Sequence, residues 1–246
     1  MKKLCFTLNE IINYIYTMAR FSRIEVALKM AETGMIPVFF NRDVEICKKV
    51  LEASYRGGIR LFEFTNRGDY AHCVFETLNK FAEKEFPEMI LGTGSVIDAA
   101  TATLYMQLGS NFIVSPLLNE EMAWVCNRRK VLWAPGCGSV SEISRAETLG
   151  AEIVKIFPGA QVGGPKFVAA VKGPMPWTRI MPTGGVEPTE ANLTEWFKAG
   201  AVCCGMGSQL IKSDLIKAGN FQQIEEDIKT AIELVKRLRV QYPVKM

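Results

Sequence analysis

The stretch Ile153-Val154-Lys155-Ile156-Phe157-Pro158 is a short apolar run with strand propensity that carries a single lysine. In a strand, successive side chains alternate between two faces, so Lys155 would share a face with Ile153 and Phe157. Burial disfavours the charged form of a lysine and lowers its pKa. A neutral amine is a nucleophile that can form a Schiff base with a carbonyl substrate. The alternative is an edge-strand lysine whose ammonium reaches solvent.

Similar apolar runs, rich in β-branched residues, recur along the chain with helical patterns between them. The runs predict strands at 35–40, 60–66, 89–95, 111–116, 131–135, 153–158, 179–184 and 201–206. Several of the intervening helical patterns end in a glycine, as is typical just past a helix. Eight alternations of strand and helix predict an α/β fold, the (β/α)8 TIM barrel.

The chain of 246 residues fits one large α/β domain, and no Pro/Ser-rich linker divides it. We expect a single domain over 1–246, with 1–17 as an extension that the fold does not need. An amphipathic pattern of Ile24, Ala27, Met30 and Ala31 predicts a short helix that closes the barrel floor. Apolar residues spaced by three and four over 221–238 predict a last helix that packs against the barrel.

Composition argues against several classes of function. The net charge of +3 comes from 29 basic and 26 acidic residues without a Lys/Arg block, so nucleic acid is not an expected partner. No run approaches the roughly 18 apolar residues of a membrane span, and 1–20 lack the continuous apolar core of a secretory signal. Seven cysteines without C-x-x-C spacing favour a reducing cytoplasm. Because His72 is the only histidine, a multi-histidine metal site is excluded.

Unusual polar residues fall near the carboxyl ends of the predicted strands, where the active sites of TIM barrels lie. Glu63 shares a strand face with Leu61 and Thr65, which directs its carboxylate inward. A buried carboxylate is costly unless it is paired or used, so Glu63 is either a salt-bridge partner, for example of Lys155, or a general acid/base. Arg67 is either a bidentate ligand of a carboxylate or an exposed loop arginine.

Glycines gather after the seventh and eighth predicted strands, in Pro182-Thr183-Gly184-Gly185 and Gly205-Met206-Gly207-Ser208. Glycine lets the backbone approach an anion, and a helix beginning at Ser208 would aim free N–H groups at the same place. The loops after strands seven and eight are the usual phosphate site of a TIM barrel. The alternative is that these glycines only serve tight turns. Two glycine-rich turns at matching positions favour a phosphorylated substrate.

Seven segments, in chain order, resemble the 2-keto-3-deoxy-6-phosphogluconate aldolases, which also act as 4-hydroxy-2-oxoglutarate aldolases. They are residues 61–67, 91–95, 114–116, 134–136, 154–158, 182–186 and 205–208. The resemblance implies that Lys155 is the Schiff-base lysine and that Glu63 is the general acid/base. It also implies that Arg67 binds the pyruvyl carboxylate.

The resemblance further implies a substrate pocket around these residues. Its expected members are Arg67, Ser95 and Thr183, then Pro116 and Phe157 beside the pyruvyl group, and Gly184, Gly185 and Ser208 around phosphate. Two departures from the family pattern bear on substrate choice. Ser95 stands where the family commonly has threonine, and Cys137 replaces a usually aliphatic residue beside the expected site.

The sequence therefore predicts a class I aldolase without cofactor. It would reversibly cleave 2-keto-3-deoxy-6-phosphogluconate to pyruvate and glyceraldehyde 3-phosphate, and also 4-hydroxy-2-oxoglutarate to pyruvate and glyoxylate. The resemblance implies a homotrimer. A non-catalytic barrel that binds phosphosugar acids remains an alternative, although it has no need of a buried Lys155 with Glu63. A phosphosugar isomerase or epimerase, which would need acid/base pairs without an imine, remains another. The sequence does not separate the C4 epimers of the substrate.

Overall fold

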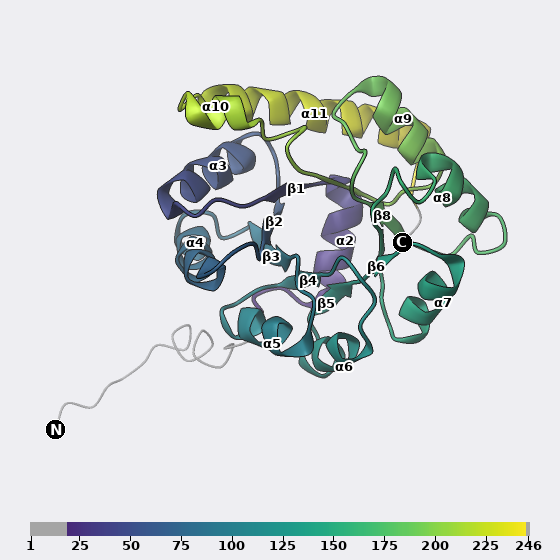
Figure 1. Cartoon of the computed structure of the whole chain (residues 1–246). Coiled ribbons are helices and arrows are strands. Elements are labelled where there is room, and N and C mark those ends of the chain that lie inside the picture. Colours follow the sequence, from purple (N-terminus) through teal and green to yellow (C-terminus); the bar gives the residue numbers. More distant parts are fainter. Residues whose placement is uncertain (1–18, 245–246) are drawn as a thin grey trace, which may run out of the picture.

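The computed structural model describes residues 19–244, in which strands and helices alternate and the helices form a ring around the strands (Figure 1). The strands are β1 Met35–Phe39, β2 Leu61–Thr65, β3 Ile90–Gly94, β4 Phe112–Val114, β5 Leu132–Ala134, β6 Gly136–Cys137, β7 Val154–Ile156, β8 Ile180–Pro182 and β9 Cys204–Met206. The helices are α2 Arg23–Thr33, α3 Val44–Arg56, α4 Ala71–Glu85, α5 Ala99–Gln107, α6 Glu120–Arg129, α7 Val140–Thr148, α8 Gly164–Lys172, α9 Glu190–Lys198, α10 Ser213–Lys217 and α11 Phe221–Gln241. The predicted extension 1–17 lies outside the described residues.

The strands form parallel sheets, which confirms the predicted α/β class. One sheet has the order β5-β4-β3-β2-β1-β9, and the other has the order β6-β7-β8. Two isolated parallel bridges, Ile180 with Ala201 and Thr183 with Gly205, join the β8 side to the β9 side. The carboxyl ends of the strands therefore gather on one side of the molecule.

The fifth predicted strand ends at Pro135, and a second short strand, β6, follows it directly. Proline has no N–H to donate to a neighbouring strand, so the ladder is interrupted there. Its carbonyl still accepts a hydrogen bond from Lys155 N–H at 2.9 Å, while Ser115 N–H donates to the Ala134 carbonyl at 3.1 Å. As a result β5 pairs with β4, and β6 pairs with β7. The strand predicted over 131–135 corresponds to β5, and β6 is a further short strand that the sequence analysis did not predict.

The two faces of the strands pack into separate apolar clusters. The inner cluster consists of Val26, Ala27, Met30, Ile36, Leu61, Ile90, Phe112, Val114, Leu132, Ala134, Ile153, Met181 and Cys203. The outer cluster lies between strands and helices and includes Val154 and Ile156. This division confirms the two faces predicted for the strand at 153–157, because Ile153 lies inside and its alternating neighbours lie outside.

Helix α2 lies across the centre of the ring in Figure 1 and supplies three members of the inner cluster. It begins with a capping box, in which Ser22 accepts a hydrogen bond from Glu25 N–H and the Glu25 side chain accepts one from Ser22 N–H. The predicted helix is confirmed, and its predicted apolar face is confirmed in part, because Ala27 and Met30 are buried. Val26 is buried, whereas Ile24 is 65% exposed.

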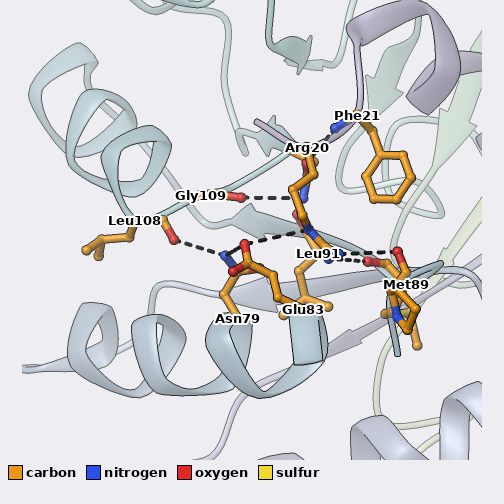
Figure 2. Close-up of polar contacts among 10 residues, drawn as sticks. Arg20, Phe21, Asn79, Glu83, Met89, Leu91, Leu108 and Gly109 are labelled. Atoms are coloured by element: carbon orange, nitrogen blue, oxygen red, sulfur yellow. Dashed lines mark hydrogen bonds and ion pairs between the residues drawn. The ribbon is translucent and has the colours of Figure 1, made fainter. Parts of the chain in front are cut away.

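The segment before α2 is fixed by polar contacts at the start of β3. Figure 2 shows Arg20 between Glu83 and Met89; its guanidinium donates to the Met89 carbonyl at 3.0 Å, and its Nε lies 3.6 Å from Glu83 Oε1. Phe21 N–H donates to Asn111 Oδ1 at 3.1 Å. These contacts hold the chain where it enters α2.

Helix α11 buries Ile224, Ile228, Ile232, Val235 and Leu238, which confirms the predicted packing face of the last helix. In Figure 1 it runs along the outside of the ring beside α3, α9 and α10. Within residues 19–244, no helix combines the length and the apolar character that crossing a membrane requires.

Candidate active site

Glu63 and Lys155 point into the same interior. Each follows a member of the inner cluster by two residues, Glu63 after Leu61 and Lys155 after Ile153. Because alternate residues of a strand share a face, both side chains lie inside, nearer the carboxyl ends of the strands than the inner cluster. Their exposed fractions are 1% for Glu63 and 5% for Lys155. Residues 92 positions apart in the chain thus share one desolvated space.

Burial dominates the electrostatics of this pair. Desolvation raises the pKa of Glu63, opposed by the positive charges of Lys155 and then Arg67. Desolvation also lowers the pKa of Lys155, where Glu63 opposes the shift and Arg67 adds to it. Both shifts favour the neutral forms, a free amine and a carboxylic acid. Such a pair is suited to nucleophilic attack by the amine and to proton transfer by the carboxyl group.

The contacts of Glu63 do not support the purely structural alternative. In the described part of the chain, no ion pair within 4.0 Å joins Glu63 to Lys155 or Arg67. Oε2 of Glu63 is buried without a hydrogen-bond partner. An unsatisfied buried polar group costs about 1–3 kcal/mol, and more when it is charged. The fold bears this cost without forming a close salt bridge in return.

The surroundings of Lys155 bring together two residues predicted to line a pyruvyl pocket. Its Nζ lies 4.9 Å from the centre of the Phe157 ring. In the neighbouring strand Lys155 pairs with Gly136, and a β-carbon at Gly136 would overlap the backbone of Pro116. Pro116 therefore packs against the strand residue that stands beside Lys155. Phe157 and Pro116, both half-buried, thus approach the lysine from the β7 and β4 sides.

Ser95 lies directly after β3, at the end of the strand that pairs with β2. It is half-buried and adopts a φ of 57°, in the left-handed region that non-glycine residues rarely enter. Residues in such conformations gather at functional sites, where the surrounding structure maintains them. The preceding residue, Gly94, packs against the Glu63 carboxyl group.

The loops after β7 and β8 run side by side. Gly159 N–H donates to the Thr183 carbonyl at 2.8 Å, and Thr183 also forms the bridge to Gly205. The hydroxyl oxygen of Thr183 is buried without a hydrogen-bond partner. Gly184 and Gly185 have φ values of 90° and 77°, a conformation that favours glycine. The predicted glycine-rich turn therefore needs its glycines for backbone conformation, whatever else it binds.

The helix predicted to begin at Ser208 is absent, and this prediction is wrong. A turn follows β9 instead, in which Leu210 N–H and Ile211 N–H donate to the Gly207 carbonyl at 3.0 and 3.1 Å. The next helix, α10, begins only at Ser213. Hydrogen-bond donors to an anion near Ser208 must therefore come from the N–H groups of this turn and from the serine hydroxyl. No α-helix begins there to add its free N–H groups.

A pocket of about 340 Å³ contains two of the predicted site residues, Arg67 and Ser208. It lies between the end of β1, the turn after β9, and α10, and its polar lining also includes Asn41 and Lys217. Sequence reasoning missed both. Asn41 directly follows a predicted strand, which could have revealed it, whereas Lys217 carries no comparable signal. Among the pocket's lining residues neither Lys155 nor Glu63 appears, so it adjoins rather than contains that pair.

Two other expectations concern Cys137 and metals. Cys137 belongs to the outer cluster, and burial raises the pKa of its thiol to about 12. Its side chain therefore packs under the helices rather than beside the site, contrary to the expectation. No group of three or more His, Cys, Asp or Glu side chains within 19–244 is arranged to hold a metal ion.

Residues 25–227 match a family model described as KDPG and KHG aldolase. The chain belongs to this aldolase family. KHG/KDPG aldolase of Escherichia coli (strain K12) is 30% identical to this aldolase over 202 residues, which cover 82% of this chain and 92% of that protein. The 2-dehydro-3-deoxy-phosphogluconate aldolase of Pseudoalteromonas atlantica is 32% identical over 198 residues, covering 80% and 89% respectively.

Solved structures agree with this assignment. A KDPG aldolase from Legionella pneumophila, with pyruvate captured as a covalent carbinolamine intermediate, matches this aldolase with a TM-score of 0.76 at 28% identity. The match covers 83% of this chain and 97% of that one. The predicted family resemblance is thereby confirmed, and this aldolase is a carbon–carbon lyase. Neither the non-catalytic barrel nor the isomerase alternative fits this membership.

Proposed function

We propose that this aldolase reversibly cleaves 2-keto-3-deoxy-6-phosphogluconate into pyruvate and glyceraldehyde 3-phosphate through an imine on Lys155. The observation that carries the proposal is a buried lysine of lowered pKa that faces the same interior as a buried carboxyl group. The neutral Nζ attacks the C2 carbonyl carbon and forms a carbinolamine. Loss of water gives the protonated imine, which accepts the electron pair of the C3–C4 bond when that bond breaks.

Glu63 is the proton carrier of this cycle. As an acid it protonates the leaving hydroxyl of the carbinolamine, and as a base it takes the proton of the C4 hydroxyl, which releases the aldehyde product. It then returns a proton to C3 of the enamine, after which water hydrolyses the pyruvyl imine. One group can serve in both directions because desolvation raises its pKa from the ordinary range of a carboxyl group.

The remaining predicted residues bind the substrate. Arg67, whose charge acts on both Glu63 and Lys155, would hold the pyruvyl carboxylate. Pro116 and Phe157 form apolar walls beside the lysine. Ser95 and Thr183 offer hydroxyl groups at the rim, and Gly184, Gly185 and Ser208 supply donors to the phosphate.

We infer a second activity, the cleavage of 4-hydroxy-2-oxoglutarate to pyruvate and glyoxylate. The family description names both aldolases, and one similar solved structure carries both names at 26% identity. The two substrates share the pyruvyl half that Lys155 and Arg67 would bind. They differ in the distal half, so discrimination falls to the residues around Ser208.

We further propose that the strands close into a (β/α)8 barrel in which β5 and β6 are one interrupted strand, and that 1–246 is a single domain. The inner cluster and the two bridges between the β8 and β9 sides support closure. We propose a homotrimer in a reducing cytoplasm, as the family resemblance and the cysteine usage imply. Light scattering at micromolar concentration should give three times the mass of the chain, and a monomer mass would refute the trimer.

The imine proposal is tested by trapping with pyruvate and borohydride. We expect intact-mass analysis to show one pyruvyl adduct and peptide mapping to place it on Lys155. Lys155→Ala should abolish the adduct, while Lys229→Ala, which removes an exposed lysine of α11, should leave it unchanged. Equal trapping in Lys155→Ala would show that another amine forms the imine.

A further inference from the structure

The pocket that contains Arg67 and Ser208 is lined by charge of one sign. Its charged lining residues are Arg67 and Lys217, and both are cations. Lys217 is exposed at the end of α10 and forms no ion pair within 4.0 Å in the described part of the chain, not even with Asp214 on the same helix. Two cations that share a pocket repel each other unless an anion lies between them. The pocket is therefore complementary to an anionic group.

The neutral polar groups of the pocket point to the same kind of ligand. Oδ1 of Asn41 already accepts a hydrogen bond from Asp43 N–H at 2.9 Å, so the amide NH₂ is the end left free to donate. Ser208 and Ser213 add hydroxyl groups to the lining. A phosphate dianion is acceptor-rich and matches a wall of donors and cations. Val38 of β1 adds an apolar side chain to the lining.

The pocket also connects to the reaction centre. Arg67 lines it and at the same time shifts the ionisation of Glu63 and Lys155, so its guanidinium lies within electrostatic reach of both. A substrate bound to Lys155 at its keto carbon can thus extend past Arg67 toward Ser208. Lys217 lines the same pocket as Ser208, and the proposed mechanism assigns no part to its side chain.

We propose that Lys217 of α10 is a specificity-determining residue whose ammonium, together with Asn41, binds the phosphate at the distal end of the substrate. This inference rests on the proposed cleavage of a phosphorylated 2-keto sugar acid. Lys217 acts on substrate binding and not on the bond-breaking step, since it stands outside the interior that holds Glu63 and Lys155. It sets the preference for the phosphorylated substrate over the shorter 4-hydroxy-2-oxoglutarate.

The test compares Lys217→Gln with unaltered enzyme on both substrates. We expect KM for the phosphorylated substrate to rise roughly 3- to 10-fold, since partly exposed charge pairs contribute modestly. The kcat for that substrate and both constants for 4-hydroxy-2-oxoglutarate should stay unchanged, and Lys217→Arg should restore the low KM. Lys212→Gln is the matched control, because it removes the same charge from a neighbouring side chain that pairs with Asp227 outside the pocket.

The outcomes separate this inference from the proposed function. If unaltered enzyme cleaves the phosphorylated substrate but Lys217→Gln leaves its KM unchanged, Lys217 does not bind phosphate and the aldolase proposal stands. If Lys217→Gln raises KM equally for both substrates, or if Lys212→Gln has the same effect as Lys217→Gln, then any loss of positive charge in this region weakens binding. The inference about Lys217 is then wrong. If unaltered enzyme releases no pyruvate and Lys155 is not trapped, the proposed function fails and this inference fails with it.

Discussion

Oε1 of Glu63 occupies the place above Gly94 where a β-carbon would stand. Gly94 is the last residue of β3 and pairs with Thr65 of β2, which lies two residues after Glu63 on the same strand. Its φ lies outside the left-handed region, so the backbone conformation alone would accept other residues. Glycine is needed here because the carboxyl group must lie close to the neighbouring backbone. Gly94 therefore positions the proposed proton carrier.

We predict that Gly94→Ala lowers kcat by roughly 10²-fold or more while the protein stays folded. The methyl group would push the Glu63 carboxyl group out of its place, and general acid/base catalysis contributes about 10²–10⁴-fold. Glu63→Gln should lower kcat by a similar factor, although the glutamine side chain fills the same volume as glutamate. Pyruvate release measures kcat, and circular dichroism measures folding.

Gly173→Ala is the matched control for this substitution. Gly173 follows α8 with a right-handed φ of −59°, and a β-carbon there would lie 3.4 Å from the Ala170 carbonyl oxygen, so a methyl group fits. Near-normal kcat in folded Gly94→Ala would mean that Glu63 works from another position or has no role in proton transfer.

A second prediction concerns the titration of Lys155. Burial is the main cause of its lowered pKa; the ionised Glu63 raises it, and Arg67 lowers it. Removing Arg67 as Arg67→Met should therefore move the Lys155 titration to higher pH, and Glu63→Gln should move it to lower pH. In reductive methylation the neutral amine attacks formaldehyde, water is lost, and added cyanoborohydride reduces the imine to a methylamine. The extent of methylation at Lys155, followed across pH by peptide mapping, therefore reports its titration.

An internal reference is present in every sample, because exposed Lys229 is methylated in the same reaction. In unaltered enzyme the methylation of Lys155 should reach half its maximum below pH 10.5, which is the ordinary pKa of a lysine side chain. Shifts of the same sign in Arg67→Met and Glu63→Gln would show that the two charges do not act on Lys155 as the geometry indicates.

The inner residues of the site could be predicted because strand geometry leaves little freedom. Once 153–157 is a strand, Lys155 must share a face with Ile153, and the same alternation takes Glu63 inward after Leu61. Helix α2 was harder, since an amphipathic pattern does not say how much of its apolar face is covered. The inner cluster accepts Val26 and leaves Ile24 exposed.

The loops could not be predicted to the same extent, because their course depends on contacts distant in the chain. The turn after Ser208 ends with two hydrogen bonds to the Gly207 carbonyl instead of continuing as a helix. Lys217 comes to line the same pocket as Arg67 only because α10 lies beside the end of β1. Neither arrangement leaves a periodic pattern. Pro135, in contrast, was a readable signal for the interruption between β5 and β6.

A third prediction tests the contacts that hold the segment before α2. Arg20 donates to the Pro87 carbonyl at 3.2 Å and to the Met89 carbonyl at 3.0 Å, and Arg20→Met would leave both acceptors without this partner. We expect a loss of about 1–3 kcal/mol in the free energy of unfolding in urea, with kcat unchanged. Arg128→Met, which removes an exposed arginine of α6, should change stability little. An equal loss in both variants would remove any special role for Arg20.

The last prediction concerns Ser208, which shares its pocket with Arg67 and Lys217. Ser208→Asp would place a carboxylate against the phosphate, in the pocket that both cations line. Repulsion of the phosphate and capture of the cations act in the same direction, so KM for the phosphorylated substrate should rise by roughly 10²-fold, about 2.7 kcal/mol. The rise for 4-hydroxy-2-oxoglutarate should be much smaller, because its distal end carries less charge and reaches less far.

Gln209→Asp is the matched control for this substitution. It adds the same charge one residue later, where the side chain lines a different pocket with Asp227, and it should leave KM for both substrates unchanged. If Ser208→Asp weakens both substrates equally, or if the unaltered enzyme already prefers an unphosphorylated sugar acid, then the phosphate does not bind at Ser208 and the neighbouring glycines serve only the turns.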